Sequence, residues 1–133
     1  MNKYEGESEI TLNEIDYPVK INCRVVSAFN TMRSCDLANI AVKSINAIHK
    51  TRDFNALDRA EIMTGAVSMT DAATLFYLAA KEKNSQVEFG EFQEAVILEG
   101  ALETGTKKSY PFVFANLVES LVFGITDDAK KNS

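Results

Sequence analysis

A change of hydrophobic periodicity near the start of the chain most strongly limits how it can fold. Apolar residues alternate with polar ones from Ile10 to Cys23, and a period of two indicates β-strands with one buried face. From Val25 onward the apolar residues recur at helical spacing. The chain has 133 residues, enough for one domain with one core. We therefore predict a mainly α (α+β) fold, in which a short N-terminal β-hairpin precedes an α-helical domain.

The alternating segment contains its own turn. Asn13 and Glu14 interrupt the pattern, and the apolar positions change from even to odd numbers across them. Such a shift fits either a hairpin turn or a β-bulge. Pro18 lacks the N–H that a strand ladder needs, so its strand should lie at a sheet edge. Because an isolated hairpin is marginal in water, we expect it to pack on the helices or to pair with another subunit.

These patterns divide the single domain, residues 1–133, into four segments. Residues 1–8 should form a flexible leader, residues 10–23 the β-hairpin, residues 25–125 the helical body, and residues 126–133 a flexible tail. The tail is short and polar, as chain ends that stay outside a packed core commonly are.

The most apolar helix should lie at the centre of the helical body. Ser68 to Asp71 has the pattern of a capping box, and the following residues, Ala72 to Ala80, are apolar almost all round. A helix of this kind is usually the centre of a domain, or it is shared with a second subunit. Earlier in the chain, Asp36 is the expected N-cap of a helix that begins at Leu37.

Glycine and capping signals predict where the other helices begin and end. Gly65 should end a weaker helix that starts at Phe54. Ser85 to Glu88 has the pattern of a second capping box and should open a later helix. Gly105 can close that later helix in a left-handed cap.

The last predicted helix has two faces of different character. Phe112 and Phe123 lie on the far side from the core-facing residues, nearly in line, if each residue advances the helix by about 100°. They are ordinary exposed aromatics or core contacts of fraying ends, or else a second contact surface for a partner. The core-facing stripe consists of Phe114, Leu117, Val118, Leu121, Val122 and Ile125.

Charge and hydropathy exclude several classes of function. The net charge is −5 and the basic residues are scattered, which argues against a nucleic-acid binder because phosphate neutralisation needs clustered cations. No apolar stretch is long enough to cross a bilayer, so we expect no membrane partner. The polar, acidic start from Met1 to Glu7 is no secretory signal. Cys23 and Cys35 should then be small apolar residues, reduced and at least partly buried, in a cytoplasm.

No motif in the chain predicts catalysis, a metal site or a cofactor. Glu82 to Phe92 imitates a calcium loop, but Ala80 stands at the first position, where Asp is expected, and the turn glycine is missing. Cys23, Cys35 and His49 could supply a nucleophile and a base, but no local motif joins them. We therefore expect a protein that is not an enzyme and that acts through its surfaces.

The order of these segments resembles the tail assembly chaperones of long-tailed bacteriophages. Proteins of that family often open with an apolar-polar-apolar strand, a turn and a Tyr-Pro-Val segment, as in Ile10 to Leu12 and Tyr17 to Ile21 here. A later helix of small and apolar residues follows, here Ala72 to Ala80. This helix is followed by a charged turn and then by a helix that starts with a Ser-x-x-Glu-Phe pattern, here Ser85 to Phe89. The resemblance covers most of the chain.

The end of the chain adds to this resemblance. In this family a longer product is often made by programmed frameshifting near the end of the short reading frame. Lys130-Lys131-Asn132 lies where slippery A-rich codons would be expected. The resemblance therefore implies the short, non-frameshifted product.

The resemblance implies a binding function in tail assembly. Such chaperones coat the long, helical, apolar tape measure protein in the host bacterial cytoplasm, keep it soluble and help the tail tube to assemble. They are absent from the mature virion. The implied partners are the tape measure protein, the tail tube protein, a frameshifted longer form of the chain and further copies in a homo-oligomer.

Holding amphipathic helices requires an apolar surface. The candidate partner-binding residues are Phe76 and Tyr77 in the apolar helix, and Phe112 and Phe123 on the far side of the last helix. The edge strand that contains Pro18 is a further candidate.

Two other functions stay open. One is a different phage structural protein, such as a head–tail connector or a tail completion factor, which would remain in the particle. The other is a small cytoplasmic regulator that binds a protein or a ligand in a helical pocket. A genome neighbourhood without tail genes would favour the regulator.

Overall fold

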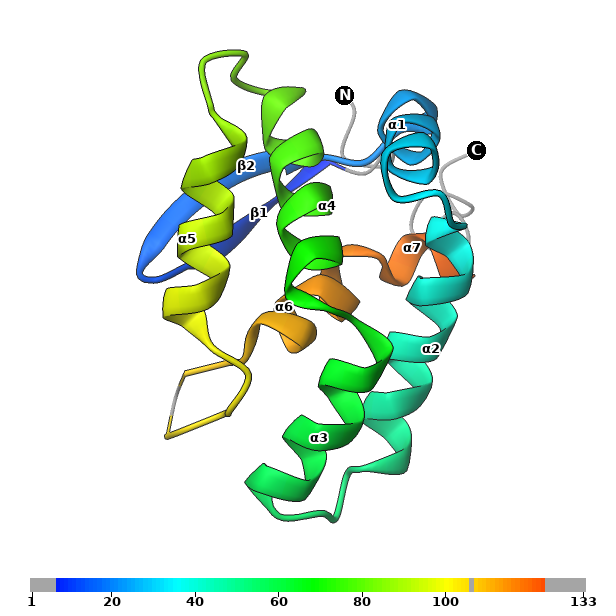
Figure 1. Ribbon diagram of the computed structural model, residues 1–133, viewed down its shortest axis with the longest axis vertical. Coiled ribbons are helices and arrows are strands. Elements are labelled where there is room, and N and C mark those ends of the chain that lie inside the picture. The colour runs from blue at the N-terminus through cyan, green and yellow to red at the C-terminus, as the bar shows by residue number, and fades with distance from the viewer. Residues whose placement is uncertain (1–6, 106, 124–133) are drawn as a thin grey trace, which may run out of the picture.

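The computed structural model describes residues 7–105 and 107–123, which form a β-hairpin followed by seven helices (Figure 1). This arrangement confirms the mainly α (α+β) fold predicted from the change of periodicity. The elements are β1 (Glu7–Leu12), β2 (Ile15–Lys20), α1 (Cys23–Arg33), α2 (Leu37–Lys50), α3 (Ala56–Ala66), α4 (Met69–Lys81), α5 (Phe89–Glu99), α6 (Tyr110–Leu117) and α7 (Glu119–Phe123).

A tight two-residue turn closes the hairpin. Asn13 and Glu14 have positive φ values of 51° and 68°, the combination that a type I′ turn requires. Leu12 pairs with Ile15 directly across this turn, so the predicted interruption is a turn and not a bulge. Pro18 lies in an edge strand as predicted, because among the described residues the sheet has two strands and each has a free edge.

The hairpin is stabilised by packing on the helices of its own chain. Leu12 and Val19 are fully buried, and the Tyr17 ring lies 4.7 Å from the ring of Phe92 in α5, measured between centroids. Burial and a hydrogen bond with Glu91 raise the pKa of Tyr17. The two strands contact α4, α5 and α6, so the hairpin is part of the domain core.

The segment boundaries at both ends of the hairpin differ from the predicted ones. Glu7 and Ser8, assigned to the leader, belong to β1 because they extend the ladder with β2. Cys23, assigned to the hairpin, is the first residue of α1, because the side chain of Asn22 caps that helix. The rest of the predicted leader and the whole predicted tail lie outside the described residues.

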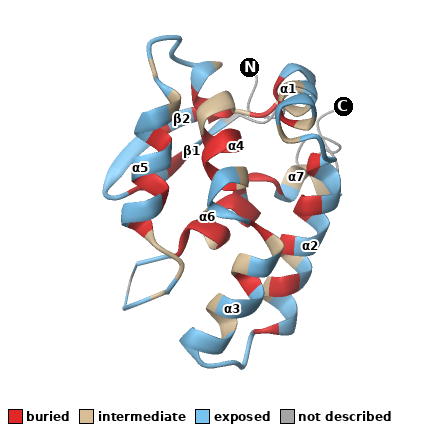
Figure 2. Cartoon of the chain, viewed as in Figure 1, coloured by how far each residue is buried: buried red, intermediate tan, exposed pale blue. Residues whose placement is uncertain are grey.

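Helix α4 lies at the centre of the domain, as its apolar sequence predicts. It contacts α1, α5, α6 and β2, and it lies between α5 and the α1–α2 pair in Figure 1. Ser68 caps it by accepting a 3.0 Å hydrogen bond from the backbone N–H of Asp71. Asp36 caps α2 in the same way, so the predicted N-caps at Ser68 and Asp36 are confirmed. The buried residues of α4, which form part of the interior coloured red in Figure 2, are Ala72, Ala73, Thr74, Leu75, Phe76, Ala79 and Ala80.

Three predicted helix ends are wrong. Helix α3 continues past Gly65, since glycine weakens a helix without ending one that is packed on a neighbour such as α2. The second capping box does not form, because α5 begins at Phe89 and its N-cap, Glu88, makes no side-chain capping bond. Helix α5 then ends at Gly100, whose φ is 79°, and Gly105 lies in the following loop.

The last predicted helix is broken into two. Val118 leaves helical geometry with φ −91° and ψ 5°, which separates α6 from α7. Helix α6 contacts α2, α3, α4 and β1, whereas α7 contacts α2 and α6. The core-facing stripe is therefore buried before the break and only half-buried after it. Its buried members are Phe114, Leu117 and Val118, its half-buried members are Leu121 and Val122, and Ile125 lies outside the described residues.

Candidate functional site

Phe76, one of the predicted partner-binding residues, lies in the core. Its side chain has an exposed fraction of 0%, and its ring lies 6.4 Å from the ring of Phe114 in α6. Because other elements cover α4 on several sides, a partner could reach Phe76 only if the domain opened. The prediction that Phe76 contacts a partner is therefore corrected: it is a packing residue.

Tyr77 is half-buried and joins α4 to α5. Its ring lies 5.6 Å from the ring of Phe89 and 6.4 Å from that of Phe92. Nζ of Lys81 donates a 3.1 Å hydrogen bond to the Tyr77 hydroxyl and lies over the same ring. Most of the aromatic surface of Tyr77 is thus used within the chain.

Phe112 and Phe123 do not form one continuous surface. The straight helix on which their alignment depended is broken at Val118. Phe112 is half-buried between two cations, with Cζ of Arg59 5.5 Å and Nζ of Lys108 4.5 Å from the ring centroid. Phe123 is 63% exposed in α7, so among the four candidates it is the one most available to a partner.

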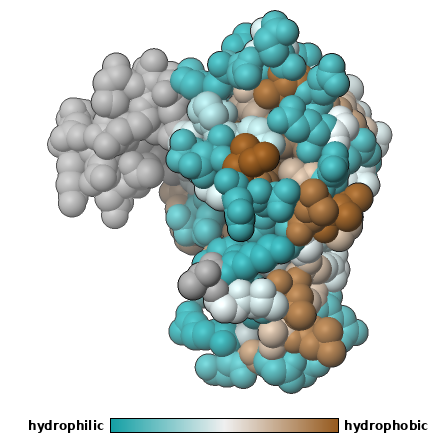
Figure 3. Space-filling view, turned by 90° about the vertical axis from the view of Figure 1, so that its left-hand side faces the viewer, coloured by the Kyte–Doolittle hydropathy of each residue, from teal (hydrophilic) through white to brown (hydrophobic). Residues whose placement is uncertain are grey.

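An exposed apolar surface lies at the C-terminal end of α5. Ile97, Leu98 and Leu102 are 62%, 50% and 41% exposed, and we call these three residues the α5-end patch. Figure 3, which views the molecule from this side, shows apolar side chains over α5 and, separately, over α3. Hydrophobic spacing does not reveal this patch, because Gly100 ends the helix between Leu98 and Leu102.

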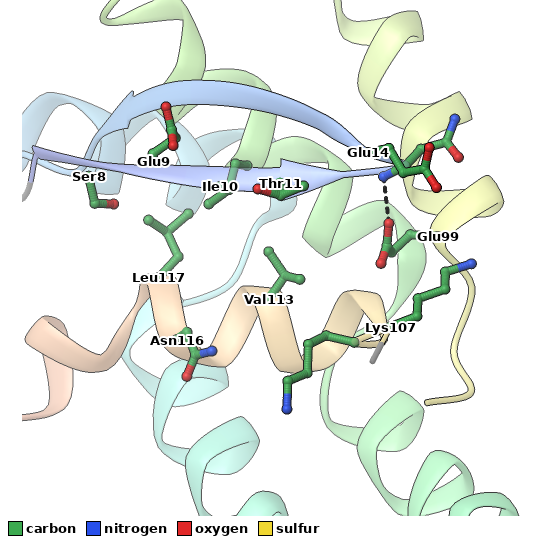
Figure 4. Close-up of a pocket in the computed structure, with 12 residues that line it drawn as sticks. Ser8, Glu9, Ile10, Thr11, Glu14, Glu99, Lys107, Val113, Asn116 and Leu117 are labelled. Carbon is green, nitrogen blue, oxygen red and sulfur yellow. Dashed lines mark hydrogen bonds between the residues drawn. The ribbon is translucent and has the colours of Figure 1, made fainter. Parts of the chain in front are cut away.

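A groove of about 640 Å³ runs between β1 and α6. Figure 4 shows Val113 and Leu117 pointing from α6 toward β1 on one side of it. The residues that line the groove are Ser8, Glu9, Ile10, Thr11, Asn13, Glu14, Glu99, Lys107, Lys108, Val113, Asn116 and Leu117. Its lining combines the apolar side chains of Ile10, Val113 and Leu117 with acidic and basic side chains.

The hairpin tip is held against the groove by a buried carboxylate. Glu99 is 6% exposed at the end of α5, and its carboxylate accepts a hydrogen bond from the backbone N–H of Asn13 (Figure 4). Nζ of Lys107 donates a 3.2 Å hydrogen bond to the backbone carbonyl oxygen of Leu98. These bonds connect the strand side of the groove to α5 and its following loop.

The titratable residues of the described chain do not gather in one place. No group of three or more His, Cys, Asp or Glu side chains among the described residues could hold a metal ion. Cys23 and Cys35 are free and exposed, which corrects the expectation that they are at least partly buried. Nδ1 of His49 lies 3.3 Å from Nη2 of Arg52, and no described hydrogen bond joins His49 to either thiol.

No protein-family model, curated protein or solved structure matches the chain. In the described part of the chain no single helix has the length and hydropathy to span a membrane. Helices α3 and α4 meet that test only as a pair, bent by 67° at their junction.

Proposed function

We propose that this protein is a tail assembly chaperone of a long-tailed phage or prophage. In this role it binds the tape measure protein, keeps it soluble and promotes assembly of the tail tube, without catalysing a reaction. The order of strand, turn, apolar central helix and charged turn supports this proposal through the family resemblance. The proposed site of action is the host bacterial cytoplasm, and the mature virion would lack the protein.

The α5-end patch is the observation that carries the proposal. Ile97, Leu98 and Leu102 are large apolar side chains within one short segment, and each keeps more than two fifths of its surface in water. Large apolar side chains exposed within one segment are unfavourable in water and favour an interaction site there. Covering it with the apolar face of a tape measure helix would yield about 25 cal/mol for each Å² removed from water.

Several weak contacts of this kind would act together along a long partner. A helical tape measure protein offers repeated apolar faces, and a homo-oligomer of the chaperone would present repeated patches to them. Linked contacts gain avidity because the second binding event becomes intramolecular. The tail tube protein and a frameshifted longer form of the chain are the further partners that this proposal includes.

Co-expression with the tape measure protein from the same genome tests the proposal. We expect the soluble fraction of the tape measure protein to rise and the two chains to co-purify in a pull-down. A tape measure protein that stays insoluble and binds nothing would overturn the proposal. Detection of the chain in purified virions would favour a connector or completion protein, and a genome neighbourhood without tail genes would favour a regulator.

A further inference from the structure

Within the described residues, one backbone edge of β1 pairs with no other strand. Hydrogen-bonded and non-hydrogen-bonded pairs alternate along an antiparallel ladder, and Leu12 and Ile15 form the hydrogen-bonded pair that closes the two-residue turn. Thr11 and Glu9 therefore occupy non-hydrogen-bonded pairs, so their N–H and C=O groups point away from β2. Among the described residues these groups have no hydrogen-bond partner.

The edge of β2 does not offer the same ladder. Pro18 pairs with Glu9 and has no N–H, so the middle of the outer edge of β2 lacks a donor. Proline is a common device by which proteins block an exposed edge. The hairpin therefore has one blocked edge and one open edge, and the open one is not the Pro18 strand that the sequence indicated as a candidate.

The open edge of β1 borders the groove. Ser8 to Thr11 line it on the strand side, and Val113 and Leu117 point into it from α6 (Figure 4). An added strand would have its backbone beside Glu9 and Thr11 and every second side chain over this apolar floor. Such strand addition draws affinity from main-chain hydrogen bonds and specificity from alternate side chains.

The charge of Glu9 determines which side chains are favourable on the outer face of an added strand. Glu9 is exposed and forms no ion pair with any described residue. At the hairpin tip, by contrast, Glu14 and Glu99 line the groove together with Lys107. A partner residue opposite Glu9 points to the outer face of the sheet, where a basic side chain would be stabilised and an acidic one repelled.

We propose that β1 binds an extended segment of a partner protein that alternates apolar and basic residues and becomes a third strand of the sheet. A second copy of this chain fits less well. Antiparallel pairing centred on Glu9 would place two Glu9 carboxylates directly opposite each other, and like charges in that position destabilise a sheet. Pairing centred on Ile10 would place each Glu9 opposite Thr11, which supplies no cation, whereas a basic partner residue would pair with the carboxylate. This inference is independent of the partner named above, because it rests on the edge of β1, the groove and the charge of Glu9.

The test uses short synthetic peptides and the full chain labelled for amide NMR. A peptide that alternates Val and Lys should bind, and it should slow hydrogen exchange at the backbone amides of Glu9 and Thr11. Two control peptides should bind at least about fivefold more weakly than the Val–Lys peptide. One alternates Val and Glu, and the other has its Lys residues in a block. Failure of the Val–Lys peptide to bind overturns the proposal, as does binding without protection of these two amides.

Two proline variants form a matched pair on the two edges. Thr11→Pro removes the outward N–H of β1, and Asp16→Pro removes the outward N–H of the residue paired with it on β2. Both variants lose the 2.6 Å hydrogen bond between Thr11 Oγ1 and Asp16 Oδ1. Thr11→Pro should weaken binding of the Val–Lys peptide about tenfold or more, and Asp16→Pro should leave it unchanged. Equal effects of the two variants would contradict strand addition at β1.

Two further measurements keep the proposal testable if a proline variant does not fold. Two peptides are methylated on the backbone nitrogen at every second residue, one at the even and one at the odd positions. Methylation of the amides that face β1 should abolish binding, and methylation of the amides that face away should spare it, because only alternate amides face β1. Glu9→Lys should reverse the preference from the Val–Lys to the Val–Glu peptide, whereas Glu61→Lys, an exposed site on α3, should not. Protection of Glu9 and Thr11 that grows with protein concentration without peptide would overturn the proposal in favour of a second copy.

Discussion

The hydroxyl of Tyr110 donates a 2.8 Å hydrogen bond to the backbone carbonyl oxygen of Val67, and both residues are buried. Tyr110 is the first residue of α6, and Val67 follows the last residue of α3. The bond therefore holds the α3–α4 junction against the start of α6, across 43 residues of sequence. Burial, with the nearby negative charge of Asp71, raises the pKa of Tyr110 to about 12.

Tyr110→Phe should destabilise the domain with little change in packing. The substitution leaves the Val67 carbonyl buried without its donor, a loss of about 1–3 kcal/mol in the free energy of unfolding. Urea unfolding followed by circular dichroism measures it. Tyr77→Phe is the control, because the Tyr77 hydroxyl accepts its hydrogen bond from Lys81 at the surface, and its effect should stay within about 0.5 kcal/mol. Equal stability of the Tyr110→Phe variant and the natural protein would show that the bond contributes nothing.

The same hydroxyl should make stability depend on alkaline pH. The pKa of Tyr110 is higher in the folded state than its ordinary value of 10.0, so the folded state holds this proton more tightly. The resulting stabilisation is complete below pH 10.0 and is lost as the pH rises through about 12. The free energy of unfolding should fall by up to about 1.4 kcal/mol per pH unit in that window.

Urea unfolding of the natural protein and of Tyr110→Phe over the alkaline range measures this contribution. The variant lacks the titrating group, so the stability difference between the two proteins should shrink as the pH rises. Other tyrosines titrate in both proteins and cancel in the comparison. A difference that stays constant across the range would mean that Tyr110 does not titrate as described.

Phe76→Ala and Phe123→Ala should separate a core residue from a surface residue. Phe76 is fully buried against Phe114, and its truncation should cost about 3–5 kcal/mol because it leaves a cavity. Phe123 is 63% exposed, so its truncation should change stability by no more than about 0.5 kcal/mol. Thermal and urea unfolding measure both. A Phe76→Ala variant as stable as the Phe123→Ala variant would contradict the packing of α4.

The α5-end patch can be tested without disturbing the fold. Ile97→Gln with Leu98→Gln removes two exposed apolar side chains from α5 and keeps good helix-forming residues. Met32→Gln with Val42→Gln is the matched control, because those side chains are 53% and 51% exposed on α1 and α2. Both double variants should unfold within about 1 kcal/mol of the natural protein.

Only the Ile97 and Leu98 variant should lower the soluble fraction of a co-expressed tape measure protein. The physical reason is that this variant removes the apolar surface on which the proposed contact depends, while the control removes similar surface elsewhere. If the two double variants lowered solubility equally, the contact would not be specific to the α5-end patch.

The local features of the fold were predictable because they depend on neighbours in sequence. The change from alternation to helical spacing located the hairpin and the helical body. Asp36 and Ser68 were recognised as N-caps since each side chain binds a backbone N–H two or three residues later. Short-range hydrogen bonds of this kind form in the same way wherever the segment is placed in a domain.

The candidate site was less predictable because exposure depends on what covers a face. Periodicity showed that α4 is apolar, but it did not show that other elements cover Phe76 and leave Ile97 exposed. The spacing left open whether Phe112 is an exposed aromatic, a core contact or a partner contact, and it did not show that Arg59 and Lys108 lie over its ring. The contact between Arg59 and Phe112 joins residues far apart in sequence, so it leaves no signal in the spacing of either segment.

The sequence by itself determined the N-terminal hairpin, the helical character of the segments that follow it and the N-caps at Asp36 and Ser68, because hydrophobic spacing and capping act over a few residues. Tertiary structure alone decided that Gly100 and not Gly105 ends α5, and that Val118 divides the last helix. It also decided that β1 borders a groove against α6. These outcomes depend on long-range contacts, such as that between Glu99 and the backbone of Asn13, which form only when distant segments have packed together.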